Sequence, residues 1–375
     1  MKIFFYIHSL TGGGAERVTA SLARHLADQG HEVGVITMTP EERDFYPLDP
    51  RVRRITLALA GTNRGLGKLT ANFCRWRALR RTLKSERPVV VVAMMTTSIV
   101  LALLAAIGLP VRVYGSERNY PGRKGTGRPW ALLRRLVYRF AAGHVAQTRE
   151  TAAWLERHTG ARNVRVIPNP VVWPIPSFPP EVAPQSVVLP KRKAILAIGS
   201  KPEQKGFDLL VRVFAGLATS SPTWDLVILG VAPESDAAYG GGKSVRRLAE
   251  EKGVAERIHL PGRVGNVADW YERADLFVLS SRYEGFPNVL LEAMAAGCAC
   301  IAFDCDTGPR DIIEPDVDGV LVPAEDVSAL TFELAGLMAD EPKRERLAGA
   351  AVRVRERFSE ERVMAKWGKV LDQVS

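Results

Sequence analysis

The sequence predicts an α/β protein built from two doubly wound, Rossmann-like domains. Two observations lead to this prediction: short apolar runs alternate with helical patterns along the whole chain, and one proline-rich stretch interrupts the alternation near the middle. Strand–helix alternation is typical of parallel sheets with helices on both faces. At 375 residues the chain is too long for one ordinary core and fits two domains of this size.

The expected elements form two series. The first series of strands runs through Ile3–Ile7, Val33–Thr37, Val89–Ala93, Val111–Tyr114, His144–Gln147 and Val164–Ile167. The second series runs through Ala194–Ile198, Leu226–Leu229, Ile258–Leu260, Leu276–Leu279, Ala299–Phe303 and Val320–Val322. Helices are expected between the strands, among them Ala15–Gln29, Phe207–Leu217 and Val289–Ala296.

Proline marks the border between the two domains. Residues 168–190 hold eight of the 24 prolines, and neither a helix nor the interior of a sheet accommodates them. We expect an N-terminal domain over 1–170, a linker over 171–190 and a C-terminal domain over 191–358. Ligands of such sheets bind at the carboxyl ends of the strands, so two domains facing each other would enclose a deep cleft.

One apolar stretch is long enough to cross a bilayer. Residues 89–109 are 21 uncharged positions. The first part is β-branched, Thr96–Ser98 makes a natural helix start, and Gly108 with Pro110 ends the pattern. A buried strand followed by a buried helix is therefore expected.

The N-terminus and the cysteines favour a cytoplasmic protein. The first apolar run has no cleavage site, so it is interpreted as a strand and not as a signal peptide. The four cysteines form no CxxC pair, and Cys298, Cys300 and Cys305 lie in or beside an apolar strand, unlike Cys74. Buried thiols in a reducing compartment are expected.

Positive charge is concentrated in the first half of the chain. Residues 1–175 hold 27 Lys and Arg against 11 Asp and Glu, whereas the remainder holds 24 against 30. Only the first half is therefore expected to meet a polyanion. Nucleic acid, an anionic membrane and a diphosphate ligand all fit this charge.

A glycine turn follows the first expected strand. Gly12, Gly13 and Gly14 lead directly into a helix, whose free N–H groups suit an anion or a close-lying sugar. The turn is not the G-x-G-x-x-G dinucleotide fingerprint, and no acid follows the second strand in the ribose-binding position. A purely structural turn is an equally good interpretation of these glycines alone.

A lysine pair follows the first strand of the second domain. Lys201 and Lys205 are expected on a loop at the carboxyl end of that strand, with Gly206 opening the next helix. Lysines so placed stabilise a departing diphosphate. A solvated loop is the alternative.

Two glutamates flank a Gly-Phe-Pro-Asn turn in the second domain. Asn288 is expected to cap a helix that begins at Val289, so that the N–H groups of residues 289–291 form a phosphate site. Glu292, one turn into the helix, can accept hydrogen bonds from a ribose, while Glu284 lies nearer to the group that the phosphates carry. The two carboxylates would then hold opposite ends of one nucleotide-sugar.

These residues resemble a known family. Glu284–Glu292 is similar to the paired-glutamate signature of retaining GT-B glycosyltransferases of family 4, and Gly12–Arg17, Lys201–Gly206 and Ile167–Val171 fall where that family places its motifs. The resemblance covers the whole chain and includes a final helix, 359–375, which in the family crosses back to the first domain. It also extends to bacterial enzymes that lengthen undecaprenyl-diphosphate-linked oligosaccharides.

The resemblance implies roles for both domains. The second domain would bind the donor, with Glu284 on the sugar hydroxyls, Glu292 on the ribose and Lys205 on the diphosphate; Glu284 and Lys205 would be catalytic. The implied donor-binding residues are Gly199, Ser200, Lys201, Lys205, Glu284, Gly285, Phe286, Pro287, Asn288, Val289 and Glu292. The implied acceptor-binding residues are Gly13, Gly14, Arg17, Arg77, Arg80, Arg81, Lys84, Glu117, Arg118 and Asn119.

The sequence departs from the family pattern at two places. Ser200 stands where the family usually has arginine, and Lys201 can supply that charge, though without the bidentate fork of a guanidinium. Arg118 stands in the segment where the family has a histidine near the reacting sugar.

Asp304 and Asp306 form a D-x-D pattern, which is the metal–diphosphate signature of a different glycosyltransferase fold. Because the periodicity here is that of GT-B, where lysines and helix N-termini replace the metal, no metal and no cofactor are expected. Gly308–Arg310 resembles the turn at which related transferases approach the donor sugar.

Two basic stretches lie in the first domain. In Lys68–Lys84 an apolar face of Leu69, Trp76, Leu79 and Leu83 adjoins a basic face of Arg77, Arg80, Arg81 and Lys84. Residues 118–149 add eight cations and no acid. With Trp130 and Leu132–Leu133 nearby, these stretches suit anionic lipid headgroups or a diphosphate with an apolar tail.

The sequence therefore predicts a retaining transferase at the cytoplasmic face of the membrane. It would move a hexose or N-acetylhexosamine, from UDP, to a lipid-linked saccharide through an α-linkage. The alternatives are the same fold with a soluble or lipopolysaccharide-core acceptor, and a nucleic-acid-binding protein. No recognition helix, zinc spacing or RNP pattern supports the latter, and the absent dinucleotide fingerprint disfavours an oxidoreductase.

Overall fold

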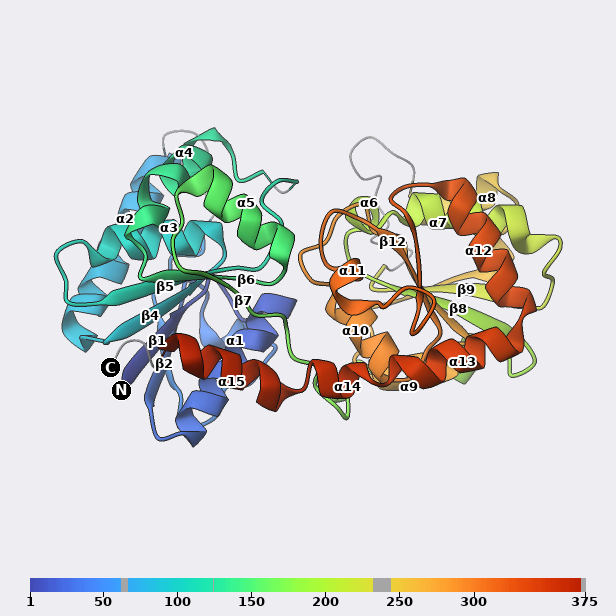
Figure 1. The fold of residues 1–375 in the computed structure, drawn as a ribbon, viewed down its shortest axis with the longest axis horizontal. Helices are drawn as coiled ribbons and strands as arrows, with labels where there is room; N and C mark the ends of the chain where they lie inside the picture. Colours follow the sequence, from blue (N-terminus) through green and yellow to red (C-terminus); the bar gives the residue numbers. More distant parts are fainter. Residues whose placement is uncertain (62–66, 124, 232–243, 372–375) are drawn as a thin grey trace. The chain divides into compact units, whose positions relative to one another are not determined.

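A computed structural model describes residues 1–61, 67–123, 125–231 and 244–371, without the side chains of residues 68 and 69. Within these ranges the chain divides into two compact units (Figure 1). Unit 1 comprises residues 1–170 and the segment from Glu361 onward, and unit 2 comprises Val171–Glu360. Each unit is built around its own parallel sheet.

The sheet of unit 1 has the order β3-β2-β1-β4-β5-β6-β7, and every pairing is parallel. Six of its seven strands are the predicted ones, shifted by a residue or more at their ends, and β3 was not predicted. The strands are β1 (Lys2–Tyr6), β2 (Glu32–Thr37), β3 (Arg53–Thr56), β4 (Val90–Met94), β5 (Arg112–Glu117), β6 (Gly143–Ala146) and β7 (Val164–Val166).

Helices cover both faces of this sheet because its strands alternate apolar side chains between two cores. In β4, Val90 and Val92 enter one core and Val91 and Ala93 the other. The first core packs under α1 (Gly14–Asp28) and α15 (Glu360–Leu371). The second packs under α2 (Gly67–Glu86), α3 (Thr96–Ala106), α4 (Arg128–Val137), the short helix η2 (Tyr138–Phe140) and α5 (Arg149–Thr159).

The long apolar stretch of unit 1 is a strand and a helix, as predicted. Residues 89–109 form β4 and α3, and α3 begins at Thr96. Almost every side chain of α3 from Thr96 to Leu103 is buried, because the helix lies between the sheet and its neighbours α2 and α4. Within the described ranges, no helix combines the length and apolarity needed to cross a membrane.

The sheet of unit 2 has the order β10-β9-β8-β11-β12-β13, again parallel throughout. All six strands are the predicted ones. They are β8 (Lys193–Ile198), β9 (Trp224–Leu229), β10 (Ile258–Gly262), β11 (Leu276–Leu279), β12 (Cys300–Asp304) and β13 (Val320–Pro323).

Helices also cover both faces of the second sheet. Leu276 and Val278 of β11 enter the core under one set of helices, and Phe277 and Leu279 enter the opposite core. The first set contains α7 (Phe207–Ala218), α8 (Val245–Glu251), α12 (Val327–Ala339) and α13 (Glu341–Ala351). The second contains α9 (Val267–Arg273), α10 (Asn288–Ala295) and α14 (Val354–Arg357), while the short α6 (Pro202–Lys205) and α11 (Pro309–Ile312) lie at strand ends.

The proline-rich segment packs on unit 2. Val171, Ile175 and Val188 are buried in the core that contains Trp270 and Tyr271. The cysteines of unit 2 are buried as predicted, and burial raises the pKa of Cys298 and of Cys305 to about 12, so these thiols stay protonated. Cys74, on α2, is exposed.

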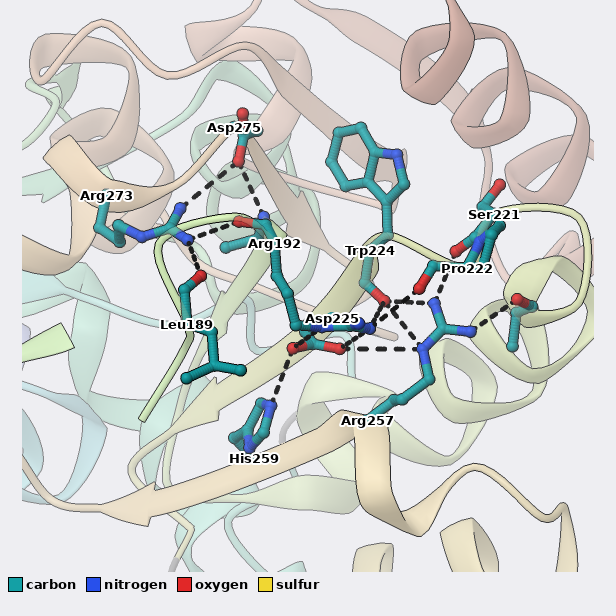
Figure 2. A network of polar contacts seen from close by, with 12 residues as sticks. Leu189, Arg192, Ser221, Pro222, Trp224, Asp225, Arg257, His259, Arg273 and Asp275 are labelled. Atoms are coloured by element: carbon teal, nitrogen blue, oxygen red, sulfur yellow. Dashed lines mark hydrogen bonds and ion pairs between the residues drawn. The ribbon is translucent and has the colours of Figure 1, made fainter. Parts of the chain in front are cut away.

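A polar network joins the amino ends of β8, β9 and β10 (Figure 2). Asp225 accepts two hydrogen bonds of 2.6 Å from Arg192, and His259 Nε2 lies 3.2 Å from it. Burial opposes the charge of Asp225, but the bonds from His259 and Arg192 outweigh it and lower the pKa of the carboxyl group. The network stabilises the fold by connecting these strands, and it lies at the opposite end of the strands from the predicted site.

Candidate active site

The predicted donor residues gather at the carboxyl ends of two neighbouring strands. β8 leads into Gly199–Lys201 and α6, and β11 leads into the loop that carries Glu284. β8 pairs with β11, and the strand order of the sheet reverses between them. Parallel sheets open a crevice for ligands at such a reversal. The two loops therefore lie where this kind of sheet binds small molecules.

Lys205 and Glu284 form an ion pair at this point. Lys205 Nζ lies 2.6 Å from Glu284 Oε1, and Ser281 Oγ donates to the same oxygen at 2.6 Å. Both side chains are largely buried, with 14% and 8% of their areas exposed. The backbone is also tied, because Ser280 Oγ donates to the carbonyl oxygen of Lys205 at 2.8 Å. A charge-assisted pair in this setting holds both groups in a fixed geometry.

Lys205 was predicted on a loop, and this is wrong: it is the last residue of helix α6. The helix forms because Pro202 stands at its first position and Gly206 ends it in the left-handed region, with φ of 62°. A side chain at Gly206 would overlap the carbonyl oxygen of Ser280. The absence of a side chain at Gly206 thus lets the loops that follow β8 and β11 approach each other. Lys201, just before α6, is exposed, as is Ser200.

The turn after Glu284 rests on the loop that follows β12. Thr307 Oγ1 donates to the carbonyl oxygen of Glu284 at 2.5 Å. Gly308 adopts a positive φ of 101°, and a Cβ there would lie 2.6 Å from Pro287. The Gly308–Arg310 turn singled out in the sequence therefore supports the Glu284 turn directly.

The start of α10 differs from the prediction by one residue. Pro287 is the cap and Asn288 the first helical residue, and no side chain caps the helix. The N–H groups of Leu290 and Leu291 were expected to be available to a phosphate, but both donate to the carbonyl oxygen of Pro287, at 3.1 and 3.2 Å. The proline carbonyl, which the sequence pattern does not reveal, takes these bonds.

Glu292 is buried inside α10 with only 6% of its surface exposed. Tyr271 Oη, from α9, lies 3.2 Å from Glu292 Oε2 and 3.1 Å from the carbonyl oxygen of Val289. Tyr271 therefore orients the carboxylate on the helix. Sequence reasoning missed Tyr271, Ser281 and Thr307, because hydroxyl groups at these spacings carry no pattern of their own.

The D-x-D pattern lies at the end of β12. Asp304 is held by Arg310 through two hydrogen bonds of 2.7 and 2.8 Å. Across the described ranges, no cluster of three or more His, Cys, Asp or Glu side chains could hold a metal ion. Asp304 thus serves as the anchor of the Gly308–Arg310 turn.

The glycine turn of unit 1 opens α1. Gly13 is the cap of the helix and Gly14 its first residue, and the N–H of Arg17 donates to the carbonyl oxygen of Gly13 at 3.1 Å. A Cβ at Gly13 would overlap the carboxylate of Glu16. Glu16 therefore folds back over the start of the helix, where its charge complements the helix dipole.

Glu117, Arg118 and Asn119 lie at the carboxyl end of β5, in contact with residues that follow β4 and β7, and a residue that follows β6 joins them. Glu117 is 2% exposed and accepts hydrogen bonds from Thr96, at 2.8 and 3.1 Å, and from Tyr138. These contacts place Glu117 within the fold. Asn119 Nδ2 donates to the sulfur of Met95 at 3.3 Å.

Arg118 is a buried cation. It donates through one nitrogen to Asn169 Oδ1, which also accepts from Gln147 at 2.9 Å. Its Nε and Nη1 have no hydrogen-bond partner among the described residues. Burial lowers the pKa of the guanidinium to about 9, because desolvation disfavours the charged form.

The basic helix α2 presents most of its predicted face to solvent. Arg77, Arg81 and Lys84 are exposed, whereas Arg80 donates to the carbonyl oxygens of Ala105 and Ile107 at 2.8 and 2.6 Å. Leu79 and Leu83 are buried and Trp76 packs beside them, as predicted. The side chain of Leu69, expected on the same apolar face, lies outside the described residues.

The two sheets have the GT-B fold, and two glycosyltransferase family models together cover most of the chain. Residues 12–172 match the family model described as Glycosyltransferase Family 4, and residues 181–353 match the one described as Glycosyl transferases group 1. The chain belongs to the glycosyltransferases that combine these two domains in this order.

Known proteins align with the whole chain. An undecaprenol-linked-glycan α-1,4-N-acetyl-D-galactosaminyltransferase from Campylobacter jejuni is 28% identical, covering 100% of this chain and 99% of its own. The amylovoran biosynthesis glycosyltransferase AmsD of Erwinia amylovora is 25% identical, with 99% of each chain covered. Among solved structures, a sucrose-phosphate synthase from Thermosynechococcus elongatus superposes with a TM-score of 0.83 at 21% identity, over 100% and 99% of the two chains. The Anabaena protein HepE, in complex with UDP and glucose, superposes with a TM-score of 0.80 at 17% identity over all of both chains.

Proposed function

We propose that the enzyme transfers a hexose or N-acetylhexosamine from UDP to a polyprenyl-diphosphate-linked saccharide, with retention and formation of an α-linkage. The transfer would serve the assembly of a surface glycan at the cytoplasmic face of the membrane. The observation that carries the proposal is the buried pair of Lys205 and Glu284 at the reversal point of the second sheet.

The pair supplies one group for each part of a nucleotide-sugar. Lys205 provides a positive charge for the diphosphate, and Glu284 accepts hydrogen bonds from sugar hydroxyls. When the donor enters, the diphosphate takes the place of Glu284 as the partner of Lys205. Glu292, held by Tyr271, is the acceptor for the ribose hydroxyls. Gly199, Ser200, Lys201 and the turn 285–289 line the donor between these points.

The chemistry needs little acid or base from the protein. The bond between the anomeric carbon and the diphosphate oxygen breaks as the acceptor oxygen bonds to the same face of that carbon. The acceptor proton passes to the departing diphosphate oxygen. Lys205 stabilises the negative charge that develops on the leaving group, and Lys201 supplies the charge of the family arginine that Ser200 replaces.

The lipid-linked acceptor is supported by one relative and by charge. The Campylobacter jejuni protein is named for a saccharide carried on undecaprenol diphosphate. Unit 1 of this chain exposes Arg77, Arg81 and Lys84 on α2, and these cations suit the diphosphate of such an acceptor and the anionic headgroups around it. Gly13, Gly14, Arg17, Arg118 and Asn119 complete the proposed acceptor side.

A panel of UDP-, GDP- and ADP-sugars tests the donor. We expect a thermal shift from UDP-sugars alone, and we expect Glu292→Ala to reduce that shift. UDP is the nucleotide present in the HepE complex. A shift from GDP- or ADP-sugars in place of UDP-sugars would overturn the donor assignment, and an equatorial product linkage by NMR would overturn retention.

A synthetic prenyl-diphosphate saccharide and its soluble, lipid-free counterpart test the acceptor. We expect turnover with the former to exceed turnover with the latter by about tenfold or more. Equal turnover would favour the same fold acting on a soluble acceptor.

A further inference from the structure

Unit 1 contains an apolar pocket of about 540 Å³ that the proposed chemistry does not use. Its walls come from the ends of α3 and α4, the start of β5 and the helix η2, and they include Leu103, Ile107, Val111, Val137 and Phe140. Arg112 is the charged residue of the lining. A concave apolar pocket of this size is large enough for part of a hydrocarbon chain.

The pocket lies at the amino end of the first sheet. Arg112 is the first residue of β5 and Glu117 the last. They are five residue steps apart along the strand, which corresponds to about 16 Å. The pocket is therefore separate from Arg118 and Asn119, which follow the carboxyl end of the same strand.

Exposed apolar side chains lie on the rim of the pocket and along α4, the helix that leads into η2. Ile107 and Phe140 belong to its rim and are 65% and 73% exposed. Leu132 and Leu136 are also exposed, and with Phe140 they recur every four residues along α4 and η2, which places them in one stripe. Contiguous exposed apolar residues on a soluble domain mark a contact surface. We call this set, Ile107, Leu132, Leu136 and Phe140, the apolar stripe.

The sequence-based expectation included the basic stretch 118–149, but it relied mainly on other apolar residues. It named Trp76, Trp130 and Leu133, and all three pack against the core under α2 and α4. Of the residues singled out there, Leu132 is the one that belongs to the apolar stripe.

Cations border the apolar stripe. Arg112, Arg135 and Arg139 are exposed, and the guanidinium of Arg139 lies 5.6 Å from the centre of the Phe140 ring. Arg80 reaches the same border, since it binds the carbonyl oxygen of Ile107. No acidic residue occurs between Glu117 and Glu150. Apolar residues flanked by cations, with no acid among them, match the boundary between the acyl chains and the headgroups of an anionic leaflet.

We propose that the pocket takes an acyl chain of an anionic phospholipid, with the lipid phosphate on the bordering arginines and the apolar stripe inserted beside it. The proposal rests on the proposed function in one respect, the membrane as partner. A second copy of this chain is a poorer occupant, because a two-fold contact would bring the same cations against each other.

Vesicle binding by the full chain tests the proposal. We expect binding to vesicles of phosphatidylcholine and phosphatidylglycerol, and at least tenfold weaker partitioning of Phe140→Ser. Phe332→Ser is the matched control, because Phe332 is a comparably exposed phenylalanine on α12 of unit 2 and should leave binding unchanged. Equal partitioning of both variants and the wild type would overturn the role of the apolar stripe.

The depth of insertion distinguishes binding of an acyl chain in the pocket from electrostatic attraction to the membrane surface alone. We expect lipids brominated on the acyl chain to quench the added fluorescence of Phe140→Trp but not that of Phe332→Trp. Association without such quenching would overturn the acyl-chain site and leave the proposed function standing. UDP release from a UDP-sugar, measured without vesicles, reports on the proposed function alone, so the two can fail independently.

Discussion

Lys205 and Glu284 are 79 residues apart in the sequence and 2.6 Å apart in the structure. Each would be costly to bury alone, and each makes the burial of the other possible. Their contact also means that a substitution at either position leaves a charge with a changed environment. The effect on catalysis must therefore be separated from the effect on stability.

Glu284→Gln keeps the shape and removes the charge. We expect turnover to fall by about a hundredfold, because hydrogen bonds to the sugar weaken in the transition state, while UDP binding changes little. Steady-state kinetics and calorimetric titration with UDP measure the two quantities. Glu345→Gln, an exposed change on α13, is the control. Unchanged turnover in Glu284→Gln would remove this glutamate from the mechanism.

Replacement of Arg118 is expected to make the protein more stable, whereas most substitutions of buried residues make a protein less stable. Replacing it with Met removes a buried charge that has one neutral partner, and Asn169 keeps its bond from Gln147. We expect the free energy of unfolding without ligand to rise by about 1–3 kcal/mol, while transfer activity falls. Denaturant unfolding and turnover measure the two effects. A less stable Arg118→Met with normal activity would show that the arginine serves the fold alone.

At the scale of elements, Gly206 determines how closely the loops after β8 and β11 approach each other. We expect Gly206→Ala to destabilise the protein by about 2 kcal/mol or more, because a Cβ there combines a positive φ with overlap on Ser280. Gly216→Ala, within α7 and with open space around it, should stabilise the protein by about 0.5–1 kcal/mol. Thermal unfolding of both variants checks the pair, and equal effects would contradict this account of Gly206.

The elements show what the sequence could and could not reveal. Apolar runs predicted twelve strands because most of them are buried on both faces. They missed β3, since Arg53–Thr56 is an edge strand with two arginines and its position depends on pairing with β2. In the candidate site, the sequence pattern singled out Glu284, Glu292 and Lys205, whose roles toward the donor stay predictions. It did not single out their partners, because contacts between distant loops leave no local pattern.

A buried histidine of unit 1 makes a contribution to stability that depends on pH. His144 is 1% exposed, stacks on Tyr138 and has its pKa lowered to about 4 by burial. Between about pH 6.5 and 4 the unfolded chain binds a proton that the folded chain does not. His144 therefore makes stability fall with falling pH in this window, by about 3 kcal/mol in total. We expect His144→Gln to flatten that slope in pH-dependent unfolding, and an unchanged slope would contradict the assignment.

The core of unit 1 depends on a helix from the far end of the sequence. Trp367 of α15 is 1% exposed and packs in the core with Ile3 and Val35. We expect Trp367→Ala to destabilise unit 1 by about 3–5 kcal/mol. Hydrogen exchange should then accelerate in β1 and α1 but not in β8. Phe332→Ala, at an exposed position, is the control, and acceleration confined to α15 would contradict the dependence.

This arrangement has a consequence for biosynthesis. The ribosome synthesises Ile3 and its neighbours before unit 2, yet the side chains of α15 that cover them, Val363 to Leu371, are synthesised only after all of unit 2. During synthesis, one apolar face of unit 1 therefore stays uncovered while unit 2 can already fold. We expect chaperones that bind nascent chains to contact this apolar face. Unit 1 can complete its folding only after α15 has been synthesised.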